Sequence, residues 1–115
     1  MSKKTKITNA IPETVLNHLK KLGDNIMLAR KRRGFTQEHL AAQVLVDRNT
    51  IRRLEKGDPG VSLGIMATTL WTLQLESDLN ALARPENDQL GQSLSEAATK
   101  KRVRIKKQDK DEYDF

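Results

Sequence analysis

Length, composition and charge exclude several classes of protein. The chain has 115 residues, a formal net charge of +6 and no cysteine, so we expect one domain with at most a tail, and no disulfide or thiolate site. The hydrophobic share of 37% is low for a chain that packs throughout. The excess of basic over acidic residues favours nucleic acid, an anionic membrane surface or an acidic protein as partner.

The N-terminal sequence and the hydropathy indicate a cytoplasmic protein. The opening MSKKTKITNAIPETV is basic, but no apolar run follows it, so it does not predict a signal peptide. No stretch approaches the roughly 18 apolar residues that a membrane span needs. Residues 1–12 are polar and end at Pro12, and we expect a loose N-terminal arm there.

Two helices are predicted between residues 13 and 44. The first is indicated by apolar residues three and four positions apart, namely Leu19, Leu22, Ile26 and Ala29. It runs into RKRRG, where basic side chains complement the C-terminus of the helix and Gly34 ends it. TQEHLAAQV follows as a second helix, with Thr36 as its N-cap.

Three more helical segments are predicted before residue 85. Asp47 is a suitable N-cap for a third helix, RNTIRRLEK, which Gly57 ends. Ser62 caps a fourth helix, whose apolar stripe consists of Leu63, Met66, Leu70 and Leu73. The short segment SDLNALA is the fifth and ends before Pro85. Because no alternation of period two occurs before residue 100, we predict an all-α, five-helix domain over residues 13–84.

Residues 85–115 form a tail of different composition. Aliphatic residues are few, KKRVRIKK at 100–107 holds six cations and no acid, and the final DKDEYDF is acidic. We expect a flexible basic tail that is largely disordered, or that becomes ordered on a partner. Val103 and Ile105 alternate with cations, so a short strand at 102–106, exchanged across a dimer, is the alternative.

The third predicted helix has one basic face. On a helical wheel of about 100° per residue, a single arc of about 140° contains Arg48, Arg52, Lys56, Asn49 and Arg53. Ile51 and Leu54 lie on the opposite side, with Glu55 beside them. Arginine can bridge O6 and N7 of guanine, and asparagine can bridge N6 and N7 of adenine. These are the residue types of a helix that reads the major groove, whereas a merely solvated face would mix positive and negative charges.

Two short helices joined by a tight turn, the second of them basic, describe a helix-turn-helix. TQEHLAAQVLVDRNTIRRLEKG resembles the Cro/C1-type (XRE) helix-turn-helix over all 22 positions. The matching features are the opening Thr36-Gln37-Glu38, Leu40-Ala41, Val46, Thr50-Ile51, Arg53 and Leu54-Glu55-x-Gly57. The resemblance implies a Cro/C1-type fold and sequence-specific binding of double-stranded DNA.

The resemblance also implies roles for single side chains. The positions that usually face base edges hold Arg48, Asn49, Arg52 and Arg53. Phosphate contacts, or bracing of the reading helix, are expected from Thr36, Gln37, Lys56, Arg32 and Arg33. For the last two, a solvated helix end is the equal alternative. Glu55 borders the apolar face and needs a partner if it is buried, so we expect a structural ion pair with Arg30.

Two positions depart from the family pattern. Leu45 stands where the family favours glycine, and Asp47 stands where it favours serine. A residue other than glycine at positive φ costs roughly 1 kcal/mol or more, so we expect the turn to be reshaped rather than strained. Asp47 still caps the helix, but its charge repels phosphate, which favours a shifted docking angle.

The remaining candidates give weak signals. His18 and His39 have no acidic cluster at metal-ligand spacing, no serine shows a histidine–acid pattern, and phosphate-binding glycine motifs are absent. We therefore expect no enzyme, no metal, no cofactor and no small-molecule ligand. Trp71 lies off the apolar stripe of its helix; core packing is expected, with a dimer or partner contact as the alternative.

The expected partners are DNA, a second copy and a kinase. One module buries little surface, so we expect a homodimer on a palindromic operator. EKGDPGVSLGIMATTLWTLQLESDLNALARPENDQLG, followed by KKRVR, resembles HipB-type antitoxins, which implies a repressor of its own operon that neutralises a HipA-like serine/threonine kinase toxin. A stand-alone phage-type repressor, or an RNA-binding or bridging adaptor that uses the basic tail for affinity, is the alternative.

Overall fold

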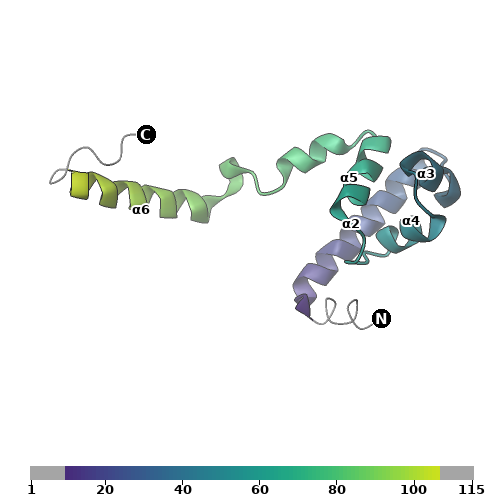
Figure 1. Cartoon of the computed structure of the whole chain (residues 1–115), viewed down its shortest axis with the longest axis horizontal. Coiled ribbons are helices and arrows are strands. Elements are labelled where there is room, and N and C mark those ends of the chain that lie inside the picture. The colour runs from purple at the N-terminus through teal and green to yellow at the C-terminus, as the bar shows by residue number, and fades with distance from the viewer. Residues whose placement is uncertain (1–9, 107–115) are drawn as a thin grey trace. The chain divides into compact units, whose positions relative to one another are not determined.

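The computed structural model describes residues 10–106, with side chains up to residue 103. Its regular elements are all helical (Figure 1): α2 (Glu13–Arg32), α3 (Gln37–Val44), α4 (Arg48–Glu55), α5 (Leu63–Thr72), the 3-10 helices η1 (Glu76–Ala81) and η2 (Pro85–Asn87), and α6 (Gln89–Lys106). No strand occurs in these residues, which confirms the all-α prediction. The fifth predicted helix takes the tighter 3-10 form as η1.

The chain divides into two compact units that meet between Leu79 and Asn80. The first unit contains α2 to α5 and most of η1, and the second contains η2 and α6. The arm at 1–12, the domain at 13–84 and the tail at 85–115 stay predictions. Most of that arm, residues 1–9, lies outside the described residues, as do residues 107–115, which include the acidic DKDEYDF.

In the first unit, two of the three predicted helix N-caps form side-chain hydrogen bonds. The Thr36 hydroxyl accepts a hydrogen bond from the His39 N–H at 3.0 Å, and the Ser62 hydroxyl accepts one from the Ile65 N–H at 3.1 Å. Both side chains therefore cap their helices as predicted. Asp47 occupies the N-cap position of α4, but its side chain makes no capping hydrogen bond. The prediction that the Asp47 side chain caps α4 is therefore wrong. The main-chain carbonyl of Asp47 instead accepts a hydrogen bond from the Thr50 N–H at 2.9 Å.

The core of the first unit lies where α2, α3, α4 and α5 converge. α4 packs against α2 and α3, and α5 packs against α3 (Figure 1). Each helix supplies apolar side chains to this core, which contains Ile26, Ala29, Leu40, Ala41, Val44, Ile51, Leu54, Leu70 and Leu73. Burying one of the leucine, isoleucine or valine side chains contributes about 1.5–3 kcal/mol. The packing fixes which face of α4 remains outside.

A glycine allows α2 and α4 to cross closely. Gly23 is buried on α2, and a Cβ at this position would meet the main-chain carbonyl of Glu55 and lie 2.8 Å from that of Leu54. Gly57, at φ 79°, lies beside Lys20, whose Cα would be 2.6 Å from a Cβ there. The C-terminal end of α4 therefore rests on α2 at two points that admit no side chain.

In the second unit, α6 begins at an aspartate cap. The carboxylate of Asp88 accepts a hydrogen bond from the Gly91 N–H at 2.9 Å, and its carbonyl accepts one from the Gln92 N–H at 2.9 Å. The alternative of a short strand at 102–106 is wrong, because this range is part of α6. Of the 18 residues of α6, 12 are Ala, Leu, Arg, Lys, Gln or Glu, which favour helix. A strand would also need a ladder partner for its main chain.

No helix among residues 10–106 is long and apolar enough to cross a membrane.

Candidate nucleic-acid interface

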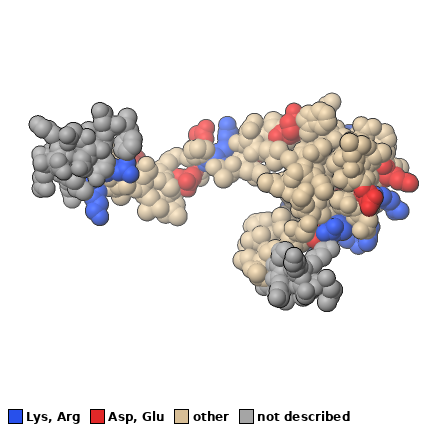
Figure 2. Space-filling view, viewed as in Figure 1, with Lys and Arg blue, Asp and Glu red and all other residues tan. Residues whose placement is uncertain are grey.

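The two faces of α4 have opposite surroundings. Ile51, Leu54 and Glu55 are buried, whereas the outer face presents exposed Arg48, Asn49, Arg52 and Lys56. Figure 2 shows Lys and Arg side chains gathered along the edge of the first unit where α4 lies in Figure 1. The wheel derived from the sequence therefore corresponds to a real division between a packed side and a basic, solvent-facing side.

A buried polar network holds α4 in place. Arg30 donates from Nε to Oε2 of Glu55 at 2.6 Å and from Nη2 to Oε1 at 3.0 Å. Its third nitrogen, Nη1, donates to the carbonyl of Phe35 at 2.8 Å. Glu55 is 2% exposed and Arg30 is 7% exposed, so this two-pronged pair lies out of water. The pair joins α2 to α4, as expected from the sequence.

Gln37 belongs to the same network. Its side-chain amide donates to Oε1 of Glu55 at 3.0 Å, so one carboxylate binds residues from both preceding helices. This hydrogen bond is the contact that bracing of α4 requires, and a phosphate contact of Gln37 stays a prediction. Thr36, expected among the phosphate or bracing residues, has its hydroxyl at the cap of α3.

Arg53 has surroundings different from those of the other three expected base readers. It is half-buried, and its Nε lies 2.7 Å from Oδ2 of Asp58. The other carboxylate oxygen of Asp58 accepts the Gly60 N–H at 2.7 Å, and the Asp58 N–H donates to the carbonyl of Arg53 at 3.0 Å. Asp58 thus closes the end of α4 and holds the Arg53 guanidinium. Asp58 is not predicted by the sequence to lie in this surface, since nothing in its spacing marks it.

Arg52 and Asn49 contact each other on the outer face. The Nε of Arg52 donates to Oδ1 of Asn49 at 3.2 Å. Both side chains are exposed, so this hydrogen bond sets their relative orientation without removing them from solvent. An arginine fork and an amide are therefore presented side by side.

The basic residues at the end of α2 separate into two cases. Arg33 donates from Nη1 to the carbonyl of Ala29 at 2.8 Å and so satisfies the end of its own helix. Arg32 is exposed in the last turn of α2. Lys56 follows α4 directly and is also exposed. All three cations are exposed, and Arg33 differs in that its guanidinium already binds its own helix.

In the turn between α3 and α4, a leucine takes the left-handed backbone conformation that usually favours glycine. Leu45 has φ 66° and ψ 45°, and its side chain is 89% exposed. The expected reshaping of this turn is therefore wrong. The N–H groups of Leu45 and Val46 both reach the carbonyl of Ala41. This pairing satisfies the end of α3 only when Leu45 is left-handed, so the leucine takes the strained conformation.

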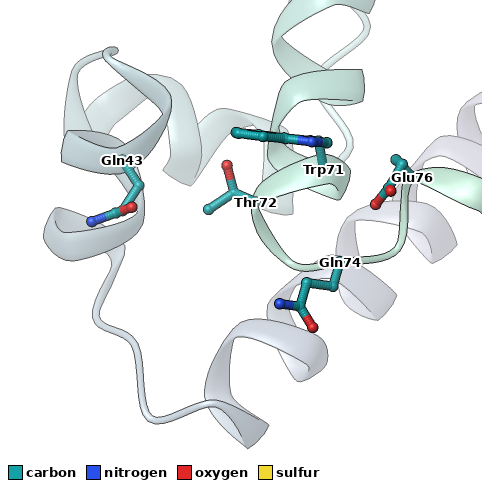
Figure 3. A pocket seen from close by; sticks show the side chains of 5 residues that line it. All are labelled: Gln43, Trp71, Thr72, Gln74 and Glu76. Atoms are coloured by element: carbon teal, nitrogen blue, oxygen red, sulfur yellow. The ribbon is translucent and has the colours of Figure 1, made fainter.

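Trp71 lies on the surface rather than in the core. Its side chain is 64% exposed, which contradicts the core expectation, because the buried side of α5 is taken by Thr69, Leu70 and Leu73. In Figure 3 its ring borders an open hollow of about 510 Å³, which is lined by Gln43, Trp71, Thr72, Gln74 and Glu76. The partner-contact alternative is compatible with this exposure.

The part of the chain that the structure describes contains no candidate metal-binding site. No group of three or more His, Asp or Glu side chains there could hold an ion. His39 instead packs its ring against Phe35, with 4.8 Å between the ring centroids.

Comparisons with known proteins bear on this interface. A family model described as helix-turn-helix matches residues 26–67, which run from the middle of α2 into α5. A search of curated proteins found no match. The matched segment contains the buried network, the left-handed turn and the exposed basic face of α4. This match supports the Cro/C1-type (XRE) helix-turn-helix family for the segment, and with it a DNA-binding transcriptional regulator.

Proposed function

We propose that the protein is a sequence-specific transcriptional repressor that places α4 in the major groove of its operator. The observation that supports this most is the combination of two features of α4. Its outer face presents exposed hydrogen-bonding side chains, and its inner face is fastened by Arg30, Glu55 and Gln37. A reading helix needs both, because base recognition requires donors held at fixed positions.

The base readers in this proposal are Arg48, Asn49, Arg52 and Arg53. An arginine fork fits the O6 and N7 of guanine, and the amide of Asn49 fits adenine. Arg32 and Lys56 are suited to phosphates on either side of the groove because both are exposed cations. Phosphate contacts orient the domain, and base contacts supply the sequence preference.

The repressor is proposed to act as a homodimer. A single module of this kind buries limited surface on DNA, whereas two related modules double both the contacts and the length of sequence read. Two-fold symmetry puts the reading helices about 34 Å apart, one turn of DNA, so the operator is a palindrome.

We further propose that this repressor is an antitoxin. The sequence after the reading helix resembles HipB-type antitoxins, whose partner is a HipA-like serine/threonine kinase toxin. The chain would then repress its own operon and neutralise the kinase by direct binding. Exposed Trp71 supports a protein contact on the first unit, because aromatic side chains are enriched at such surfaces.

Sequence specificity is tested by titrating the full chain against the DNA upstream of its own gene and against a scrambled duplex of equal length. We expect much tighter binding to the upstream DNA, and a steep loss of affinity with salt on both duplexes because phosphate neutralisation releases counterions. Equal affinities would refute the repressor and favour a non-specific adaptor.

The antitoxin role is tested by isolating the chain from its native host under mild conditions. A copurifying serine/threonine kinase, whose activity the chain suppresses, is the expected result. Recovery of the repressor bound to its upstream DNA, with no kinase and no kinase gene beside its own, would favour a stand-alone phage-type repressor.

A further inference from the structure

The second unit contains a helix whose surface is nearly all in solvent. In α6, every described side-chain position is exposed except the half-buried Gly91. Leu90 and Leu94 are 71% and 61% exposed. Most helical stability in proteins comes from packing of an apolar face against other elements, and the exposed side chains of α6 provide little of it. Contacts with another molecule would therefore stabilise α6.

The charge of α6 is concentrated toward its C-terminal end. Glu96 is the last acid of the helix, and the cations Lys100, Lys101 and Arg102 follow it, all exposed. In the sequence, 100–107 contains six cations and no acid. Like charges so close along a helix repel one another and oppose its formation. A polyanion bound along this segment would remove that repulsion.

Complementing the helix dipole does not account for these cations. That effect is worth about 0.3–1 kcal/mol and is limited to the last turn of a helix. α6 ends at Lys106, so Lys100, Lys101 and Arg102 all precede its last turn. Successive residues point about 100° apart, and the three cations therefore spread over about 200° of the helix surface rather than form one stripe. Such an arrangement suits phosphates approached from more than one side, but not the reading of base edges.

We propose that the segment formed by Lys100, Lys101 and Arg102 on α6 is a second nucleic-acid contact, which binds DNA phosphates without regard to sequence. The proposal rests on DNA being the ligand of the first unit. A weak second contact on the same chain then acts at high effective concentration and raises the affinity of the full chain for DNA. For this reason DNA is a better occupant than a separate acidic protein or an anionic membrane.

The test compares three full-length variants on a scrambled duplex and on the DNA upstream of the gene. The first variant carries Lys100→Gln, Lys101→Gln and Arg102→Gln, since glutamine retains helix propensity. The matched control carries Lys100→Arg, Lys101→Arg and Arg102→Lys, which keeps the charge. A third variant, Leu90→Ala with Leu94→Ala, alters the apolar side of the same helix. Circular dichroism of each variant reports whether α6 still forms.

Neutralisation should weaken binding to both duplexes by the same factor and flatten the salt dependence. Each phosphate contact removed should reduce the affinity change between about 50 and 200 mM salt by about 3.5-fold. The charge-retaining and the leucine variants should bind DNA like the unchanged protein. Adding DNA should also increase the helical signal of the unchanged chain more than that of the neutralised one.

Several results would overturn the proposal. They are unchanged DNA binding by the neutralised variant, a loss confined to the upstream DNA, or an equal loss in the charge-retaining control. Neutralisation that abolishes binding to anionic vesicles but leaves DNA binding intact would assign the segment to membranes instead. The scrambled duplex decides this question even if the chain proves to have no sequence preference, so failure of the repressor proposal remains distinguishable.

Discussion

Arg48 and Arg53 differ in their surroundings although both lie on α4. Arg48 is exposed, whereas Arg53 is half-buried and forms an ion pair with Asp58 at 2.7 Å. An arginine that already has a carboxylate partner must share or leave it to meet a base. Arg48 is also at the start of α4, where a reading helix usually contacts base edges. We expect Arg48 to determine base preference more strongly than Arg53.

Replacing Arg48 by alanine should cost about 1–3 kcal/mol of binding at the operator and relax the preference at one base pair. Arg48→Lys is the matched control, because lysine keeps the charge but loses the two-pronged donor. Binding of both variants to the operator, to its single-base variants and to scrambled DNA measures the effect. If Arg48→Lys binds normally and Arg48→Ala loses affinity equally on all duplexes, Arg48 contacts phosphate instead.

Glu55 is a buried charge shared by three donors, so its removal has consequences beyond one bond. Glu55→Ala leaves the Arg30 guanidinium buried without its carboxylate and deprives Gln37 of its acceptor. Breaking a buried pair in this way costs about 3–5 kcal/mol of the free energy of unfolding. Urea unfolding followed by circular dichroism measures the loss.

The double variant Arg30→Met with Glu55→Leu is the control for this prediction. It removes both charges, so it should be less destabilised than Glu55→Ala alone. A double variant that loses as much stability as the sum of its single changes would show that the two side chains act independently.

At the scale of the element, the turn before α4 carries backbone strain that a single substitution can relieve. Leu45 is left-handed and 89% exposed, so its side chain contributes little burial. Leu45→Gly should raise the free energy of unfolding by up to about 1 kcal/mol, the cost of a Cβ at positive φ less the greater chain entropy of glycine. Leu45→Ala keeps the Cβ and should leave stability nearly unchanged. A large loss in either variant would mean that the leucine side chain is packed.

The crossing of α2 and α4 depends on the missing side chain of Gly23. Gly23→Ala should destabilise the first unit by about 1–3 kcal/mol despite the better helix propensity of alanine, because the added Cβ meets the main chain of α4. Gly64→Ala on α5 is the control, since a Cβ there has only the Ser62 hydroxyl within reach, at 4.0 Å. Thermal unfolding separates them. A Gly23→Ala variant as stable as the parent would show that the helices can move apart at little cost.

At the scale of the whole molecule, the two units should unfold independently. The described side chains of α6 are exposed, and the core of the first unit draws on no residue beyond Leu79. Deleting residues 96–115 should therefore leave the thermal midpoint of the first unit nearly unchanged while weakening binding to DNA of any sequence. A lower midpoint would show that these residues pack against the first unit.

Features of this protein that depend on near neighbours in the chain could be predicted from the sequence alone. The caps at Thr36 and Ser62, the helix ends at Gly34 and Gly57, and the basic face of α4 all follow from residues within one or two turns of one another. Local hydrogen bonds and helical periodicity decide such features. The helix-turn-helix was recognisable for the same reason, since its pattern lies in one continuous stretch.

Features that depend on residues far apart in the chain, or on competing contacts, become visible only in the folded protein. The side chain of Gln37 donates to Glu55, eighteen residues away, a contact that the local sequence does not predict. Asp58 holds Arg53, and Trp71 is exposed because its neighbours on α5 already fill the core. Leu45 accepts strain because packing on both sides of the turn fixes where α3 ends and α4 begins. In each case the fold chooses between local alternatives of similar energy, and a single stretch of sequence does not contain that choice.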